Sequence, residues 1–215
     1  MEQAEILKIF EQSNALLTGH FLLSSGLHSD RYLQAALVLQ EPATALLLGG
    51  ELASRFRGER ISVVIGPALG GVVIAFAVAG GLKGSRAIFA ERQEGVFTLR
   101  RGFEIRKGEK VLVVEDVITT GGSIREVITL VKSFQAEICG VAAVAERSSQ
   151  PKDFGVRKEV LLQLPLTTFP PDDCLFCRQQ IPLVKPGSRT CHPELFPPGG
   201  GGKVGGMVKE CQNRR

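Results

Sequence analysis

The chain has 215 residues, of which 44% are hydrophobic, and this length suits one domain with a sizeable core. Its net charge is +4, but residues 199–215 carry four basic residues and one acid, so the rest of the chain is nearly neutral. The nearly neutral charge argues against a face that binds nucleic acid, and no apolar run is long enough to span a bilayer. The cysteines number five, which is odd, so a disulfide framework is not expected. Because the acidic start of the chain also lacks the basic residues of a signal peptide, we expect a soluble cytoplasmic protein.

Apolar residues at helical spacing alternate along the chain with short aliphatic runs, which predicts alternating helices and strands. The expected elements, in chain order, are a helix over 3–17, a two-stranded hairpin over 19–33, a helix over 43–57, a strand over 61–65, a helix from about 72 to 79, strands over 86–90 and 111–114, a helix after 123, and strands over 138–145 and 160–164. In the helix over 43–57, the side chains expected to face inward are Leu46, Leu47, Leu52 and Phe56. This alternation predicts an α/β fold with a mostly parallel twisted sheet flanked by helices.

Residues 91–107 interrupt the alternation. They predict a charged hairpin with a glycine at each shoulder, Gly95 and Gly102, and with few apolar side chains. We expect this segment to pack weakly on its own domain and to act as a lid over a site at the carboxyl ends of the strands.

The most informative stretch covers residues 111–123. Its four aliphatic residues predict a strand buried on both faces, and two acids, Glu115 and Asp116, follow where the strand surfaces. Residues 119–122 then offer small side chains and free backbone N–H groups, and Ser123 is expected to cap the next helix, which together makes an anion site. Because carboxylates beside a phosphate would repel it, the acids suit ribose hydroxyls or Mg²⁺. The stretch therefore predicts a sugar-phosphate site, and the alternative is an ordinary buried strand with an acidic turn.

This stretch resembles the ribosyl-phosphate signature of the type I phosphoribosyltransferases: a hydrophobic strand, two acids, two aliphatic residues and a Thr/Gly/Ser loop. A second stretch, Phe21–Tyr32, reads Phe-x-Leu-x-Ser-Gly-x-x-Ser-x-x-Tyr and resembles the N-terminal signature of the orotate-specific members. The resemblance covers roughly residues 1–188 and implies a phosphoribosyltransferase domain with a small N-terminal hood over about 1–40 and a flexible loop over about 91–107. Residues 189–215, rich in glycine and proline, are expected to form a mobile tail.

The resemblance also implies an activity, a cofactor and an assembly. Ribose 5-phosphate would pass from 5-phosphoribosyl 1-diphosphate to orotate, with Mg²⁺, giving orotidine 5′-phosphate and diphosphate in pyrimidine (UMP) biosynthesis. No protein ligand is expected for Mg²⁺, which the substrate would hold. Enzymes of this family are homodimers whose flexible loop reaches the neighbouring site, so we expect a homodimer with shared active sites.

The site residues that the resemblance implies fall into three groups. The catalytic group is Glu115, Asp116, Arg92, Arg100 and Arg101. The group that binds ribosyl diphosphate is Arg92, Gly66, Pro67, Ala68, Leu69, Gly70, Glu115, Asp116, Val117, Ile118, Thr119, Thr120, Gly121, Gly122 and Ser123. The group that binds orotate is Ser24, Ser25, Gly26, Tyr32, Thr119 and Arg147. The last group suits a planar anion, because backbone N–H groups and one guanidinium fork can orient a carboxylate.

The chain departs from the family pattern at its cations. Many members carry a lysine where this chain has Ser24, and another where it has Gly70. The stretch 93–99 also has neither the lysine nor the histidine that this loop often carries. The cations that face diphosphate would then have to come from Arg92, Arg100 and Arg101.

Two cysteine pairs raise the question of zinc. Cys174 and Cys177, with Cys191 and His192, could supply four ligands. Because Cys191 and His192 are adjacent, they would struggle to reach one ion in good geometry, and two reduced thiols are the alternative that the sequence favours.

Two other functions share some of these features. A purine-type phosphoribosyltransferase would have the 111–123 stretch but would not need the Ser-Ser-Gly hood together with Arg147. A non-catalytic regulator that senses ribosyl diphosphate and binds nucleic acid should show a basic face, which the nearly neutral body argues against.

Overall fold

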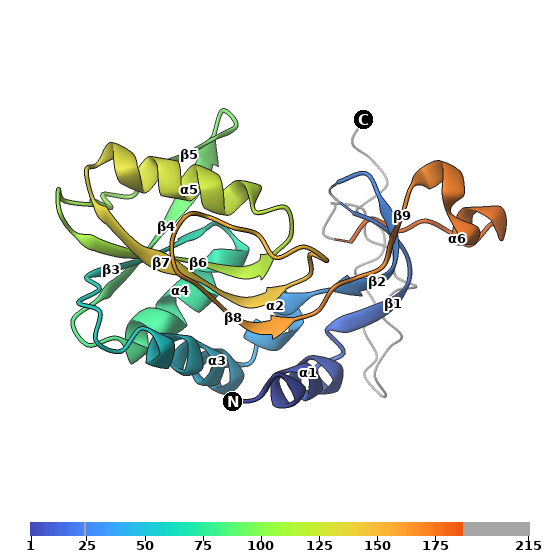
Figure 1. Cartoon of the computed structure of the whole chain (residues 1–215), viewed down its shortest axis with the longest axis horizontal. Coiled ribbons are helices and arrows are strands. Elements are labelled where there is room, and N and C mark those ends of the chain that lie inside the picture. The colour runs from blue at the N-terminus through green and yellow to red at the C-terminus, as the bar shows by residue number, and fades with distance from the viewer. Residues whose placement is uncertain (24, 187–215) are drawn as a thin grey trace, which may run out of the picture.

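A computed structural model describes residues 1–23 and 25–186 (Figure 1). The helices are α1 (Gln3–Gln12), α2 (Ala35–Leu39), α3 (Pro42–Arg55), α4 (Gly70–Gly81), α5 (Gly122–Ser133) and α6 (Leu175–Arg178), with a 3₁₀ turn, η1 (Pro171–Asp173). The strands are β1 (Leu16–Leu22), β2 (His28–Leu33), β3 (Val63–Pro67), β4 (Arg86–Gln93), β5 (Val96–Leu99), β6 (Lys110–Ile118), β7 (Glu137–Glu146), β8 (Lys158–Gln163) and β9 (Thr168–Phe169). Within these ranges, none of the helices combines the length and the apolar character that a membrane crossing requires. The expected tail, 189–215, lies outside the described residues.

The main sheet has six strands in the order β5-β4-β3-β6-β7-β8. Every neighbouring pair is parallel except β4 and β5, which form an antiparallel hairpin at one edge. The expected α/β class and mostly parallel sheet are therefore confirmed. The carboxyl ends of β3, β6 and β7 meet at one side of this sheet, which is where such folds place their ligands.

Helices cover both faces of the main sheet, with α5 on one side and α3 and α4 on the other (Figure 1). Alternate residues of β6 divide between the two sides: Val111 and Val113 join the cluster that contains the apolar face of α5, whereas Leu112 and Val114 join the cluster that contains α3 and α4. This alternation explains why the strand needs an unbroken aliphatic run.

A second, antiparallel sheet stands beside the first and forms the hood, in the order β1-β2-β9 (Figure 1). The two-stranded hairpin expected over 19–33 is confirmed, but the helix expected over 3–17 ends at Gln12. Asn14 has a positive φ of 51°, a turn conformation that stops the helix, and the chain leaves it as β1. Leu16 and Leu17 therefore belong to a strand.

Helix α3 packs through a different stripe from the one expected. Leu52 and Phe56 are fully buried as predicted, and so is Leu48, but Leu46 and Leu47 are 53% and 51% exposed. The inward expectation for these two leucines is wrong, because the helix turns them away from the stripe that meets the sheet.

The charged hairpin is built from β4 and β5. Phe97 is 4% exposed, and Arg92 forms a salt bridge of 2.8 Å with Glu126 of α5. The hairpin thus contacts its own domain more closely than its composition predicted, while its tip extends past α5 (Figure 1).

Candidate active site

The acidic pair lies inside β6, close to its carboxyl end. Glu115 is only 9% exposed, and burial, followed by the charge of Asp116, raises the pKa of its carboxyl well above the ordinary value. Asp116 is half-buried, and its Oδ1 accepts a hydrogen bond of 2.7 Å from the backbone N–H of Val117. One carboxyl therefore favours its neutral form, whereas the other is oriented by the backbone.

The loop after β6 turns tightly into α5. Gly121 has a φ of 77° and is the N-cap of the helix, so Ser123 lies in the first turn and the prediction that it caps the helix is wrong. Only glycine adopts this left-handed conformation at no cost, and a Cβ at Gly121 would also stand 2.9 Å from the ring of Phe154. A small cavity of about 50 Å³ opens against this loop. Its lining residues are Glu115, Val117, Ile118, Thr119, Thr120, Gly121, Gly122, Ser123 and Ile124. The backbone N–H groups of a helix start beside a hollow suit a phosphate.

The loop 66–71 brings a second backbone segment against the acids. It joins the end of β3 to the start of α4, and the peptide bond between Ala68 and Leu69 is cis. A Cβ at Gly66 would lie 2.4 Å from the carbonyl oxygen of Gly71, so the loop closes on itself through glycine backbone. A Cβ at Gly70 would likewise clash with the Asp116 carboxylate, so the glycine backbone lies close against this acid. The predicted diphosphate loop and the predicted ribose-binding acid are therefore neighbours, with Pro67 at the end of the strand and Leu69 exposed.

A larger cavity, of about 220 Å³, joins the hood to the phosphate loop and to the end of β7. Its lining residues are Leu23, Ser25, Thr119, Thr120, Arg147, Ser148, Ser149, Lys152, Leu166 and Thr168. Three residues expected to bind orotate, Ser25, Thr119 and Arg147, are thus brought to one cavity from segments far apart in the sequence. Gly26 forms the hood turn with a φ of 81°, and Ser24 lies outside the described residues.

Arg147 is held in place by its surroundings. Its guanidinium carbon lies 5.6 Å from the ring centroid of Tyr32, a cation–π arrangement, and burial lowers the pKa of the guanidinium. Burial also raises the pKa of Tyr32, more than the charge of Arg147 lowers it. Tyr32 therefore lies against Arg147 and is not among the residues that line the cavity.

Sequence reasoning missed the residues that follow Arg147. Lys152 brings a second cation to the cavity wall, and Ser148 lines it as well. The segment is fixed by Glu146, which is fully buried and accepts hydrogen bonds of 2.7 Å from the backbone N–H of Lys152 and from Nζ of Lys158. The one indication of these residues in the sequence is their position, because this segment follows a buried strand whose carboxyl end lies at the ligand-binding side of the sheet.

The three arginines expected to face diphosphate lie on the hairpin and the turn after it. Arg92 binds Glu126 of α5, Arg101 forms a 2.9 Å salt bridge with Glu91, and Arg100 is exposed. In the conformation described for residues 91–107, none of the three lines either cavity at the acids. The structure therefore does not bring these arginines to the other predicted site residues.

The chain is similar to known proteins along most of its length. A family model described as a phosphoribosyl transferase domain matches residues 38–156. The orotate phosphoribosyltransferase of Pelotomaculum thermopropionicum is 54% identical over 189 residues, which cover 88% of this chain and 99% of that protein. The chain belongs to the orotate phosphoribosyltransferase family. A second relative of the same name, from Caldanaerobacter subterraneus subsp. tengcongensis, is 53% identical over 88% of this chain and 99% of its own length. The crystal structure of orotate phosphoribosyltransferase from Aeropyrum pernix is 27% identical, with a TM-score of 0.63, and covers 74% of this chain and 93% of that one.

Proposed function

We propose that this protein transfers the ribose 5-phosphate group from 5-phosphoribosyl 1-diphosphate to orotate, in the pathway that makes UMP. The products are orotidine 5′-phosphate and diphosphate. The observation that carries the proposal is the cavity shared by the hood turn, the phosphate loop and Arg147, in a chain that belongs to this family. An enzyme of this pathway works in the cytoplasm, and that location is part of the proposal.

Orotate is a flat anion and would occupy the larger cavity. Its carboxylate would pair with the guanidinium of Arg147, whose planar fork offers two parallel N–H donors. Ser25 and the backbone of the hood turn would supply further donors to the ring and its carboxylate. Because Tyr32 supports Arg147 from behind, the fork is oriented before the substrate arrives, which lowers the entropy lost on binding.

Ribosyl diphosphate would lie along the carboxyl ends of β3 and β6. The 5-phosphate would take the N–H groups of residues 119–123, and diphosphate would lie against the glycine backbone of residues 66–71. Glu115 and Asp116 would meet the ribose hydroxyls between these two anions. A neutral Glu115 carboxyl can both donate and accept a hydrogen bond there, which an ionised one cannot.

The reaction exchanges one bond at the anomeric carbon of ribose for another. As diphosphate leaves, the ribose gains oxocarbenium character, and the carboxylate of Asp116 beside it stabilises this positive charge. The half-buried Asp116 carboxylate near the end of β6 fits Mg²⁺ as a substrate-held ion, since this ion keeps several waters and shares phosphate oxygens. Mg²⁺ would be held by diphosphate and ribose oxygens next to Glu115 and Asp116, and would neutralise the leaving group. The protein itself contributes mainly position and electrostatics.

We also propose that the enzyme is a homodimer. Four large apolar side chains are exposed on two helices that pack together: Leu46 and Leu47 on α3, and Val73 and Phe76 on α4. A single exposed leucine is ordinary, but several on neighbouring helices are typical of a surface that another subunit covers. A second copy of the chain is the occupant that the family favours.

The test is a spectrophotometric assay of orotate consumption with ribosyl diphosphate and Mg²⁺. We expect turnover with orotate and far slower use of adenine, hypoxanthine or uracil under matched conditions. Better use of any of these bases would overturn the proposal in favour of a purine-type or other enzyme. Tight binding of ribosyl diphosphate without turnover of any base would support a sensor instead.

A further inference from the structure

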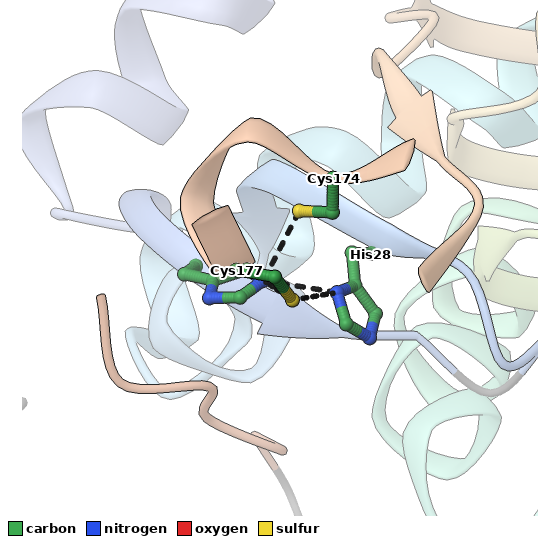
Figure 2. Close-up of side chains that lie close together, drawn as sticks. His28, Cys174 and Cys177 are labelled. Carbon is green, nitrogen blue, oxygen red and sulfur yellow. Dashed lines mark hydrogen bonds between the residues drawn. The ribbon is translucent and has the colours of Figure 1, made fainter. Parts of the chain in front are cut away.

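Four metal-binding side chains gather in the hood, and none of them is among the residues that line the cavities described above. They come from two regions of the chain, His20 on β1 and His28 at the start of β2, with Cys174 and Cys177 around the start of α6. One ligand atom from each residue lies within 4.8 Å of all the others. Figure 2 shows Cys174, Cys177 and His28 pointing toward one another from these separate elements.

Four of the distances between these ligand atoms are close to those of a tetrahedral zinc site. An ion about 2.0–2.1 Å from nitrogen and about 2.3 Å from sulfur holds its ligand atoms about 3.3–3.8 Å apart. Here Nε2 of His20 lies 3.0 Å from Nδ1 of His28, and 3.4 and 3.7 Å from the sulfurs of Cys174 and Cys177. The Cys177 sulfur lies 3.3 Å from Nδ1 of His28. The remaining pairs lie within 4.8 Å, so shifts of up to about 1 Å would place all four around one ion.

The surroundings orient these ligands as an outer shell does in zinc sites. Nδ1 of His20 lies 2.8 Å from the carbonyl oxygen of Ile181, so this nitrogen carries the proton and Nε2 faces the cluster with its lone pair. His20, His28 and Cys174 are 2%, 5% and 1% exposed. The ring of Phe176 stacks on His20 with centroids 5.5 Å apart and adds an apolar cover. Burying His20, His28 and Cys174 together without a metal leaves mainly one imidazole–imidazole contact and weak sulfur–imidazole contacts to compensate their desolvation.

We propose that His20, His28, Cys174 and Cys177 bind one structural Zn²⁺. Four protein ligands close the coordination sphere, which is typical of structural zinc and leaves no position for a substrate. Two of these ligands, Cys174 and Cys177, are also candidates in the zinc hypothesis drawn from the sequence. The two histidines of the hood take the places given there to Cys191 and His192, which lie outside the described residues.

The ion would fasten the C-terminal segment of the described chain to the hood. Strand β9 pairs with β2, so that His28 lies opposite Phe169, and the backbone of Val184 bonds to that of His20 and Leu22 at 2.8 Å. His28 directly follows the hood turn, and Thr168 of β9 lines the cavity that also contains Ser25. The zinc would therefore hold the base of the hood turn. This consequence rests on the proposed function, whereas the metal site itself does not.

The first experiment measures metal in the full-length protein, purified without chelator or histidine tag and reconstituted with Zn²⁺ under reducing conditions. We expect about one bound Zn²⁺ per chain by elemental analysis, and Co²⁺ in its place should give the visible absorption of a tetrahedral thiolate site. Cys177→Ser changes an exposed residue and keeps its size, so it should fold, lose most of the zinc and lower Tm by about 5 °C or more. His28→Gln should lose the zinc as well.

Two full-length variants serve as controls. Cys139→Ser alters the free cysteine of β7, and Cys191→Ser combined with His192→Gln removes the other candidate pair; both should keep about one Zn²⁺. Loss of zinc in the second control but not in His28→Gln would overturn the ligand set. Absence of zinc and cobalt binding, or a mass lower by two hydrogens that marks a Cys174–Cys177 disulfide, would overturn the site.

The link to the cavity has its own readout. In Cys177→Ser the KM for orotate should rise at least about threefold, while the KM for ribosyl diphosphate stays within about twofold, because only the hood turn is loosened. Equal changes in both constants, or none, would overturn this link. Zinc content and cobalt absorption do not depend on activity, so failure of the proposed function would be seen separately.

Discussion

Gly70 lies so close to Asp116 that a Cβ atom added to the glycine would stand 2.4 Å from Oδ2 of the carboxylate. The first residue of α4 thus leaves room for the acid of β6 that we place against ribose. In this arrangement a side chain at position 70 would have to displace the Asp116 carboxylate.

Gly70→Ala should therefore impair catalysis more than folding. Moving the Asp116 carboxylate disturbs both the ribose contact and the hydrogen bond from Val117, so kcat/KM should fall at least about tenfold, or about 1.4 kcal/mol. The matched control is Gly80→Ala in the same helix, where an added Cβ meets nothing within 4 Å. It should retain activity and gain up to about 1 kcal/mol of stability. Equal activity in both variants would contradict the role given to this contact.

Arg147→Ala should weaken orotate binding by about 1.5–3 kcal/mol, the range for a hydrogen bond to a charged group. The affinity for ribosyl diphosphate should change little, because Arg147 lines the cavity that we assign to orotate. Arg157→Ala is the control. Arg157 also lies over an aromatic ring, that of Phe56, but it precedes β8 and so lies at the amino end of a strand, whereas Arg147 follows the carboxyl end of β7. Calorimetric titration of each ligand distinguishes the cases. Equal losses for both ligands would show that Arg147 supports the fold instead.

Glu115→Gln should separate stability from activity. The pKa of Glu115 is raised above its ordinary value of 4.5, first by burial and then by Asp116. The folded protein thus binds this proton more tightly than the unfolded chain, so the contribution is fully present below 4.5 and is lost as pH rises through the raised pKa. Glutamine cannot ionise and avoids this loss.

At about pH 8 the Glu115→Gln variant should therefore have the higher Tm, and the difference should shrink toward pH 4.5. Its kcat should fall about tenfold or more, because an amide replaces the carboxyl at the ribose hydroxyls. Thermal unfolding across this pH range, with activity at neutral pH, checks both parts. A stability difference that grows as pH falls would contradict the assignment.

The sequence predicted the fold class well because the signal is local and redundant. The aliphatic run of β6 can be buried on two faces only in a covered parallel sheet, and the glycine loop and acids then fall at its ligand edge. Element ends were less predictable, since they depend on single backbone conformations. Asn14 ends α1 and Gly121 caps α5 through positive φ values that neither residue type requires.

Contacts between distant segments were the part that sequence patterns could not supply. His20 and His28 lie within the hood, and nothing in their spacing indicates that β9 and α6 return beside them. Lys152 likewise reaches the cavity because Glu146 fixes its segment from within the sheet. Motifs give residue types along the chain, but pairing across more than a hundred residues is decided by packing.

Removal of residues 189–215 should leave activity within about twofold of the full chain, because a glycine-rich segment of this kind buries little apolar surface. The backbone hydrogen bonds of Val184 with the hood stay intact in this variant. Activity, solubility and Tm are compared with those of the full-length protein. A collapse in any of them would move the end of the domain beyond residue 188.

The charged hairpin offers the last prediction, that it acts as a lid across the dimer. Its arginines do not line the cavities beside Glu115 and Asp116 of their own subunit. Arg92 is paired with Glu126 instead, and Arg101 is paired with Glu91. Exposed salt bridges contribute little to stability because water and salt screen them, so these pairs can exchange for a diphosphate partner. The tip of the hairpin extends past α5 (Figure 1). We expect Arg100 or Arg101 to close over diphosphate in the partner's site and exclude water.

Subunit mixing tests this directly. One inactive variant carries Arg100→Ala with Arg101→Ala, and the other carries Asp116→Asn with Thr119→Ala; the two are unfolded and refolded together. If the hairpin acts in trans, each mixed dimer has one site with an intact hairpin over an intact phosphate loop. Random mixing should then restore up to about one quarter of wild-type activity, since about half of the dimers are mixed. If it acts in cis, every site keeps a defect. Mixed dimers verified by mass but without activity would therefore rule out the shared site, and either variant refolded alone gives the baseline.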